Sequence, residues 1–90
     1  MKIIKSQDGE TIVNAEHIFY IEILDELDEN DEETGDYEIV VYFDLNVPGH
    51  DDEAHYRIAN YHSREESLRN LDRLASFLSS GNPSGLHEML

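Results

Sequence analysis

The spacing of apolar residues changes once along this 90-residue chain, close to residue 61. Before that point the apolar residues fall in short runs with a period of two, which is typical of β-strands. After it they follow the period of an α-helix. A chain of this length forms one domain, in which a single helix has to cover the apolar face of the sheet. The sequence therefore predicts an α+β domain over residues 1–81, built as an antiparallel β-meander of four to five strands with one C-terminal amphipathic helix packed on it.

Five short runs are predicted as strands. The pair Asp8-Gly9 separates the first two runs and predicts a tight hairpin, because both residues tolerate positive φ. The third run is apolar except at Glu22, so it is expected at the centre of the sheet, with Phe19, Ile21 and Ile23 on one face. The fourth run alternates most clearly and is expected to be half exposed on its second face. The runs cover residues 2–6, 10–14, 18–25, 37–45 and 54–61.

The helix is expected to begin after Ser63. A serine followed three residues later by Glu66 forms a capping box. Gly81 lies where a C-terminal cap is expected, and Pro83 prevents continuation. Residues 82–90 have no periodicity, and we predict a mobile tail there, or a segment that docks through Leu86, Met89 and Leu90. The apolar stripe of the helix is predicted to consist of Leu68, Leu71, Leu74, Ala75 and Leu78.

Acidic and basic residues are segregated along the chain. The formal net charge is −15, and no Lys or Arg occurs between Lys5 and Arg57, whereas that stretch holds seventeen Asp and Glu. Such a surface repels nucleic acid and anionic membranes, and it attracts basic protein surfaces. We therefore expect the partner to be a host protein with a basic surface, with no direct nucleic-acid or membrane contact.

The residues that could carry chemistry do not form a known catalytic or metal-binding pattern. The chain has no Cys, which excludes a disulfide, a thiolate zinc site and a Cys nucleophile. A calcium loop counted from Asp28 would need Gly at its sixth position, where Glu33 stands. The run from His50 to His55 does not have the spacing of a zinc site. Ser63 is explained by helix capping. We expect no catalysis, no metal and no cofactor.

Both ends of the chain resemble a group of small proteins common in phages and prophages of low-GC Gram-positive bacteria. The similarity covers residues 4–18, Ile-Lys-Ser-Gln-Asp-Gly-Glu-Thr-Ile-Val-Asn-Ala-Glu-His-Ile, and residues 61–68, Tyr-His-Ser-Arg-Glu-Glu-Ser-Leu. The middle departs from the pattern, because the connections at 26–36 and 46–53 are enlarged. The resemblance supplies no catalytic residues. It implies a mobile-element setting, in which small acidic proteins sometimes inhibit host nucleases, anti-CRISPR proteins among them.

These observations lead to a hypothesis of a non-enzymatic phage-type protein that binds and inhibits a basic, nucleic-acid-binding host protein, as a nucleic-acid mimic does. Its short N-terminal apolar stretch and its lack of Cys favour the host cytoplasm. The alternative is an assembly module that forms a homodimer or binds a virion protein through a strand edge or its last residues. The acids could also serve only solubility or adaptation to high salt. The predicted contacts are Asp28, Glu29, Asp31, Glu32, Glu33, Asp51, Asp52 and Glu53.

Overall fold

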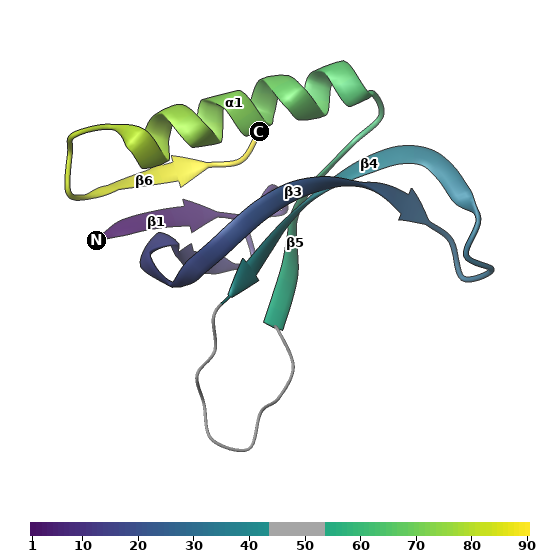
Figure 1. Ribbon diagram of the computed structural model, residues 1–90, viewed down its shortest axis with the longest axis horizontal. Helices are drawn as coiled ribbons and strands as arrows, with labels where there is room; N and C mark the ends of the chain where they lie inside the picture. The colour runs from purple at the N-terminus through teal and green to yellow at the C-terminus, as the bar shows by residue number, and fades with distance from the viewer. Residues whose placement is uncertain (44–53) are drawn as a thin grey trace.

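The structure is a computed structural model, and residues 1–43 and 54–90 are described. The α+β class and the C-terminal helix are confirmed (Figure 1). Within these ranges, no helix is long and apolar enough to cross a membrane. The elements are β1 (Lys2–Lys5), β2 (Ile12–Asn14), a 3-10 turn η1 (Ala15–His17), β3 (Ile18–Leu27), β4 (Glu33–Phe43), β5 (Ala54–Tyr61), α1 (Arg64–Ser79) and β6 (Gly85–Glu88).

The strands form two three-stranded sheets, β2-β1-β6 and β3-β4-β5. The hairpin between β1 and β2 is confirmed, and Gly9 adopts the positive φ of 76° that its turn requires. The second sheet is the antiparallel meander that the sequence predicts. In Figure 1, β6 and β1 lie beneath the C-terminal half of α1, and the β3–β4 hairpin reaches away from them.

The centre of the meander is β4, so the prediction that residues 18–25 form a central strand is wrong. β4 pairs with β3 on one side and with β5 on the other, and its Ile39 and Val41 are fully buried. Val40, on the face expected to be half exposed, is only 3% exposed. β3 lies at the edge because the β1–β2 hairpin pairs with β6 instead of with β3.

A bulge near the start of β3 changes which side chains face the core. Ile18 pairs with Phe43, but Tyr20 pairs with Tyr42, the residue that precedes Phe43. Phe19 therefore has no opposite partner on β4. This shift turns Ile18 toward the core and leaves Phe19 70% exposed. The predicted face of Phe19, Ile21 and Ile23 is therefore wrong for Phe19 only.

The helix begins as predicted, and Leu71, Leu74 and Leu78 of the predicted stripe pack on the core, but the other two members of the stripe do not. The Ser63 hydroxyl accepts a hydrogen bond from the Glu66 N–H at 3.1 Å, which confirms the N-cap. Ser67 and Asn70 are buried beside Leu74, whereas Leu68 is 40% exposed and Ala75 is exposed. Ser67 and Asn70 can face the core because each donates to a helix carbonyl one turn back. Leu68 and Ala75 were therefore wrongly assigned to the inner stripe.

Residues 82–90, expected to be a mobile tail or a segment that docks through Leu86, Met89 and Leu90, contribute a strand and a core residue, Met89. β6 pairs in parallel with β1, from Lys2 opposite Gly85 to Lys5 opposite Glu88. The N–H of Met89 then donates to the carbonyl of Lys5 at 3.0 Å, and the Met89 side chain is only 5% exposed. The tail completes the smaller sheet and closes the core from below α1.

Candidate functional site

The tip of the β3–β4 hairpin is a tight turn organised by Asp28. β3 and β4 extend into the segment expected to be a long connection, which leaves only residues 28–32 between them. One carboxylate oxygen of Asp28 accepts hydrogen bonds from the N–H groups of Asn30 and Glu32, at 2.8 and 3.1 Å. Asp31, with φ of 60°, donates its N–H to the carbonyl of Asp28. The hairpin is therefore a defined projection and not an open loop.

This projection carries a high density of negative charge. Residues 25–36 contain eight Asp and Glu and no Lys or Arg. Two of these acids have a basic partner: Glu26 contacts Arg57 at 3.3 Å, and Asp36 contacts His62 at 2.9 Å. The hairpin extends about 20 Å, or roughly one charge per 2.5 Å, against about 1.7 Å in duplex DNA. Six exposed acids have no ion pair in the described part of the chain: Asp25, Asp28, Glu29, Asp31, Glu32 and Glu33.

The predicted contact residues do not all belong to this hairpin. Its tip and the start of β4 hold the first five, Asp28, Glu29, Asp31, Glu32 and Glu33. The other three, Asp51, Asp52 and Glu53, lie outside the described residues. Phe43 and Ala54, which flank that stretch, pair with each other at the end of β4 opposite the hairpin.

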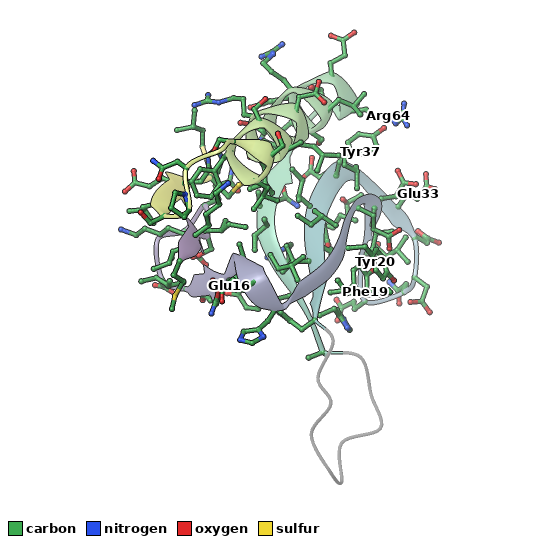
Figure 2. The ribbon with its side chains drawn as sticks, turned by 60° about the vertical axis from the view of Figure 1, so that its left-hand side comes forward. Glu16, Phe19, Tyr20, Glu33, Tyr37 and Arg64 are labelled. Carbon is green, nitrogen blue, oxygen red and sulfur yellow. The ribbon has the colours of Figure 1, made fainter. Side chains whose placement is uncertain are left out.

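The outer face of the β3-β4-β5 sheet carries a row of aromatic rings that the sequence analysis did not identify. The Tyr20 and Tyr42 rings stack at 4.2 Å between centroids, and the His55 ring follows at 5.8 Å. Phe19 meets Tyr20 edge-on at 5.6 Å. The strand register aligns these rings, because Tyr42 pairs with both Tyr20 and His55. Figure 2 shows Phe19, Tyr20 and Glu33 on the same side of the molecule, away from β6.

Carboxylates border these rings and tie the three strands together. The Tyr42 hydroxyl donates to a Glu22 oxygen at 2.6 Å. Glu26, on β3, accepts from both Arg57 and Asn60 on β5, and so it reaches across β4. Arg57 also lies 3.8 Å from Glu38. The alternation of side chains along each strand could have predicted which of these carboxylates share a face of the sheet. Their contacts with residues of other strands could not be predicted, because those contacts depend on the register between strands.

A groove of about 500 Å³ lies beside the start of β3, next to the end of α1. Ile18, Ile21 and Leu78 line it, and all three also pack against the core. Glu16 and Pro83 lie along its border. The groove is thus apolar at its base, and Phe19, which is 70% exposed, also lines it.

The β5–α1 junction places His62 next to Ser63. The Ser63 hydroxyl caps the helix, and the His62 ring lies 2.9 Å from the Asp36 carboxylate. The hydrogen bond to Asp36, together with its negative charge, raises the pKa of His62. In residues 1–43 and 54–90, no three His, Asp or Glu side chains converge as a metal site.

Comparison of the chain with protein families, with curated proteins and with solved structures found no match. The site is therefore interpreted from its own geometry: an anionic hairpin continuous with a sheet face that combines aromatic rings and carboxylates.

Proposed function

We propose that this protein is a non-enzymatic binding protein whose β3–β4 hairpin contacts a positively charged surface of another protein. The observation that supports this most directly is the group of six exposed acids on a well-defined projection, none of which has an ion pair within residues 1–43 and 54–90. Opposite charges across an interface mainly speed association and select the partner. Because the hairpin contains no Lys or Arg, its negative charge can attract a basic partner before any contact is made.

The preferred partner is a host protein that binds nucleic acid. The line charge of the hairpin is within about a factor of two of that of duplex DNA. A groove that accepts a phosphate backbone therefore offers complementary charge at a comparable density. In the phage setting that the sequence resemblance implies, occupying such a groove inhibits the host protein.

A capture experiment with two matched variants tests this proposal. The protein is immobilised, incubated with nuclease-treated host lysate and eluted with a salt gradient, and the eluted proteins are identified by mass spectrometry. The hairpin variant is D28N/E29Q/D31N/E32Q, in which the D28N change keeps a side-chain oxygen to organise the turn. The control is E10Q/E65Q/D72N/E88Q, which removes four exposed acids elsewhere.

A nucleic-acid-binding protein is expected to elute from the wild-type chain and the control at similar salt, and from the hairpin variant at much lower salt. Equal weakening in both variants would mean that only total charge matters. Undiminished retention on the hairpin variant would contradict the proposal.

The assembly alternative has one observation in its favour. Leu86 and Leu90 are 55% and 59% exposed on an otherwise highly charged chain. Deleting residues 82–90 is not a clean test, because it removes β6 and the buried Met89. The substitutions L86K and L90K keep the strand. If the protein sediments as an oligomer that these substitutions dissociate, and no lysate protein is captured, the assembly role is favoured.

A further inference from the structure

The two edges of the β3-β4-β5 sheet differ in how they are covered. Gln7 covers the β5 edge: its N–H donates to the carbonyl of Ile58, and its side-chain oxygen accepts the N–H of Asn60, both at 2.8 Å. No backbone hydrogen bond of this kind reaches the outer edge of β3 from the other described residues. An uncovered strand edge presents unpaired N–H and C=O groups to a further strand.

The register shows which groups of β3 face outward. The N–H of Asn60 points to Gln7, away from β4, so Asn60 and its partner Glu38 form a pair without mutual hydrogen bonds. In an antiparallel sheet, the backbone groups of Glu38 then point toward β3 and its partner Leu24. Alternation along β3 directs the N–H and C=O groups of Ile21, Ile23 and Asp25 to the open edge.

The apolar groove lies beside the first part of this edge. Ile21 contributes its side chain to the groove and its backbone to the edge. Leu78 and Pro83 approach from the end of α1 and the segment after it. A strand added beside β3 would place alternate side chains in this groove. Farther along the same edge, toward the hairpin, Glu22 already accepts from Tyr42, and Glu26 accepts from Arg57 and Asn60. The exposed acids there without an ion pair in the described part of the chain are Asp25 and the acids of the tip, beginning with Asp28 and Glu29.

We propose that the edge of β3 binds an extended segment of the partner protein as an added strand. The apolar side chains of this segment lie in the groove at the Ile18–Ile21 end, and its Lys or Arg side chains face the acids at the hairpin end. This inference rests on the proposed function, since it specifies how the basic partner is held. Main-chain hydrogen bonds supply the pairing, and the change from apolar to basic side chains supplies selectivity.

Charge disfavours a second copy of this chain as the added strand. Each copy carries a net charge of −15, and β3 holds no Lys or Arg that could face the acids of another β3 strand. Like charges across an interface are costly and suppress such a pairing. A basic segment neutralises the same acids, so charge complementarity selects a different protein.

A synthetic peptide tests the inference on the intact wild-type protein. The probe is a ten-residue peptide, Val-Thr-Val-Thr-Ile-Lys-Thr-Lys-Thr-Lys with blocked ends, studied together with its reversed sequence because the direction of pairing is not fixed. Two control peptides are used for each. One has alternate backbone nitrogens methylated, which removes hydrogen-bond donors and keeps the charge. The other has Glu in place of Lys.

Binding is followed by isothermal calorimetry and by amide hydrogen exchange. One orientation of the probe is expected to bind and to slow exchange at Ile21, Ile23 and Asp25. The methylated peptide is expected to bind about tenfold more weakly, as the loss of one or two net hydrogen bonds implies. The Glu peptide is expected not to bind.

Three results would overturn the inference. They are equal binding of the methylated peptide, protection confined to the hairpin tip, and failure of both orientations to bind. None of them alters the expected salt-dependent capture of a basic protein by the hairpin acids. The inference about the β3 edge can therefore fail while the proposed function stands. This separate failure would be seen if the hairpin variant no longer captured the basic protein while the peptide left amide exchange at Ile21, Ile23 and Asp25 of the wild-type protein unchanged.

Discussion

The backbone N–H of Gln7 donates to the carbonyl of Ile58 at 2.8 Å, and through this contact the first hairpin covers the outer edge of β5. The two residues are far apart in sequence: Gln7 lies in the turn between β1 and β2, and Ile58 lies in β5 of the other sheet. The Gln7 side chain accepts the N–H of Asn60 and donates to the carbonyl of Leu90 at 3.0 Å. Gln7 thus joins the first hairpin to β5 and to Leu90, and within the described residues β3 is the uncovered edge of the meander.

Replacing Gln7 by Ala should expose the β5 edge. The Asn60 N–H loses its acceptor, and we expect a loss of about 1 kcal/mol in the free energy of unfolding. The matched control is Q7E, which keeps the acceptor for Asn60 but not the donor to Leu90. Urea unfolding gives the stability, and amide exchange of Asn60 gives the local effect. Fast exchange of Asn60 in both variants would contradict the assigned role of the side-chain oxygen.

The end of α1 is capped by Lys2, not by the expected glycine. The ammonium group of Lys2 donates to the carbonyls of Phe77, Leu78 and Ser80, at 2.9, 2.9 and 2.8 Å. Gly81 does not adopt the positive φ of a glycine cap. A cation at this position satisfies terminal carbonyls and opposes the negative end of the helix dipole.

Substitution K2M should therefore lower the free energy of unfolding by about 1–2 kcal/mol, because part of the site is exposed to water. K5M removes the same charge from a residue that makes no such contact, and it should have a much smaller effect. Thermal unfolding followed by circular dichroism measures both. If the two variants are equally destabilised, net charge and not capping is responsible.

The His62–Asp36 pair makes stability depend on pH. Asp36 raises the pKa of His62 in the folded state above its unfolded value of about 6.5. The stabilising contribution is therefore fully present below pH 6.5, and it is lost as pH rises through the folded pKa. D36N should remove this dependence. The difference in unfolding free energy between wild type and D36N should shrink from pH 5.5 to pH 8.5, and the ring resonances of His62 should titrate at lower pH in D36N.

Two local signals in the sequence predicted local features correctly, whereas the glycine cap expected at Gly81 was wrong. Asp8-Gly9 specifies a turn and Ser63 specifies a helix start, because each acts on backbone groups a few residues away. Whether β3 lies at the centre or at the edge of its sheet depends instead on which strand pairs with β1. That partner, β6, is four residues long and has no alternation of its own. Short parallel pairing between chain ends leaves no local pattern to read.

The charge of the candidate site could be predicted from composition, but its shape could not. The acids of residues 28–33 are adjacent in sequence, and so they also lie together in the fold. The aromatic row combines Tyr20, Tyr42 and His55 from three strands, and their alignment requires the exact pairing register. Among the described residues, the β3 edge is open because the β1–β2 hairpin pairs with β6 and contacts β5 through Gln7, and no periodicity indicates either contact.

The rotation of α1 about its axis is testable with one pair of substitutions. Leu74 is fully buried and Leu68 is 40% exposed, although both fit the same apolar spacing. L74A should lower the free energy of unfolding by about 2–5 kcal/mol, as buried leucines generally do, and L68A should cost well under half of that. Chemical denaturation measures both. A larger effect at Leu68 would restore the helix face predicted from the sequence.

Tyr61 carries a polar group that the fold does not use. Its side chain is 3% exposed, and among the described residues its hydroxyl has no hydrogen-bond partner. Burial, followed by the nearby charge of Glu66, raises the pKa of this hydroxyl to about 12. A buried hydroxyl without a partner has lost its hydration without compensation.

Substitution Y61F should therefore leave the protein equally stable or stabilise it by about 1 kcal/mol, because the unpaired oxygen is removed and the ring is kept. The control is Y56F, since the Tyr56 hydroxyl is bonded to the Thr11 hydroxyl at 2.7 Å and its removal should be destabilising. The pH dependence gives a second readout. With a folded pKa above the unfolded value of about 10, wild type should lose stability as pH rises from 10 toward 12, and Y61F should lose less. Destabilisation of Y61F as large as that of Y56F would mean that the Tyr61 hydroxyl is bonded after all, for example to a buried water.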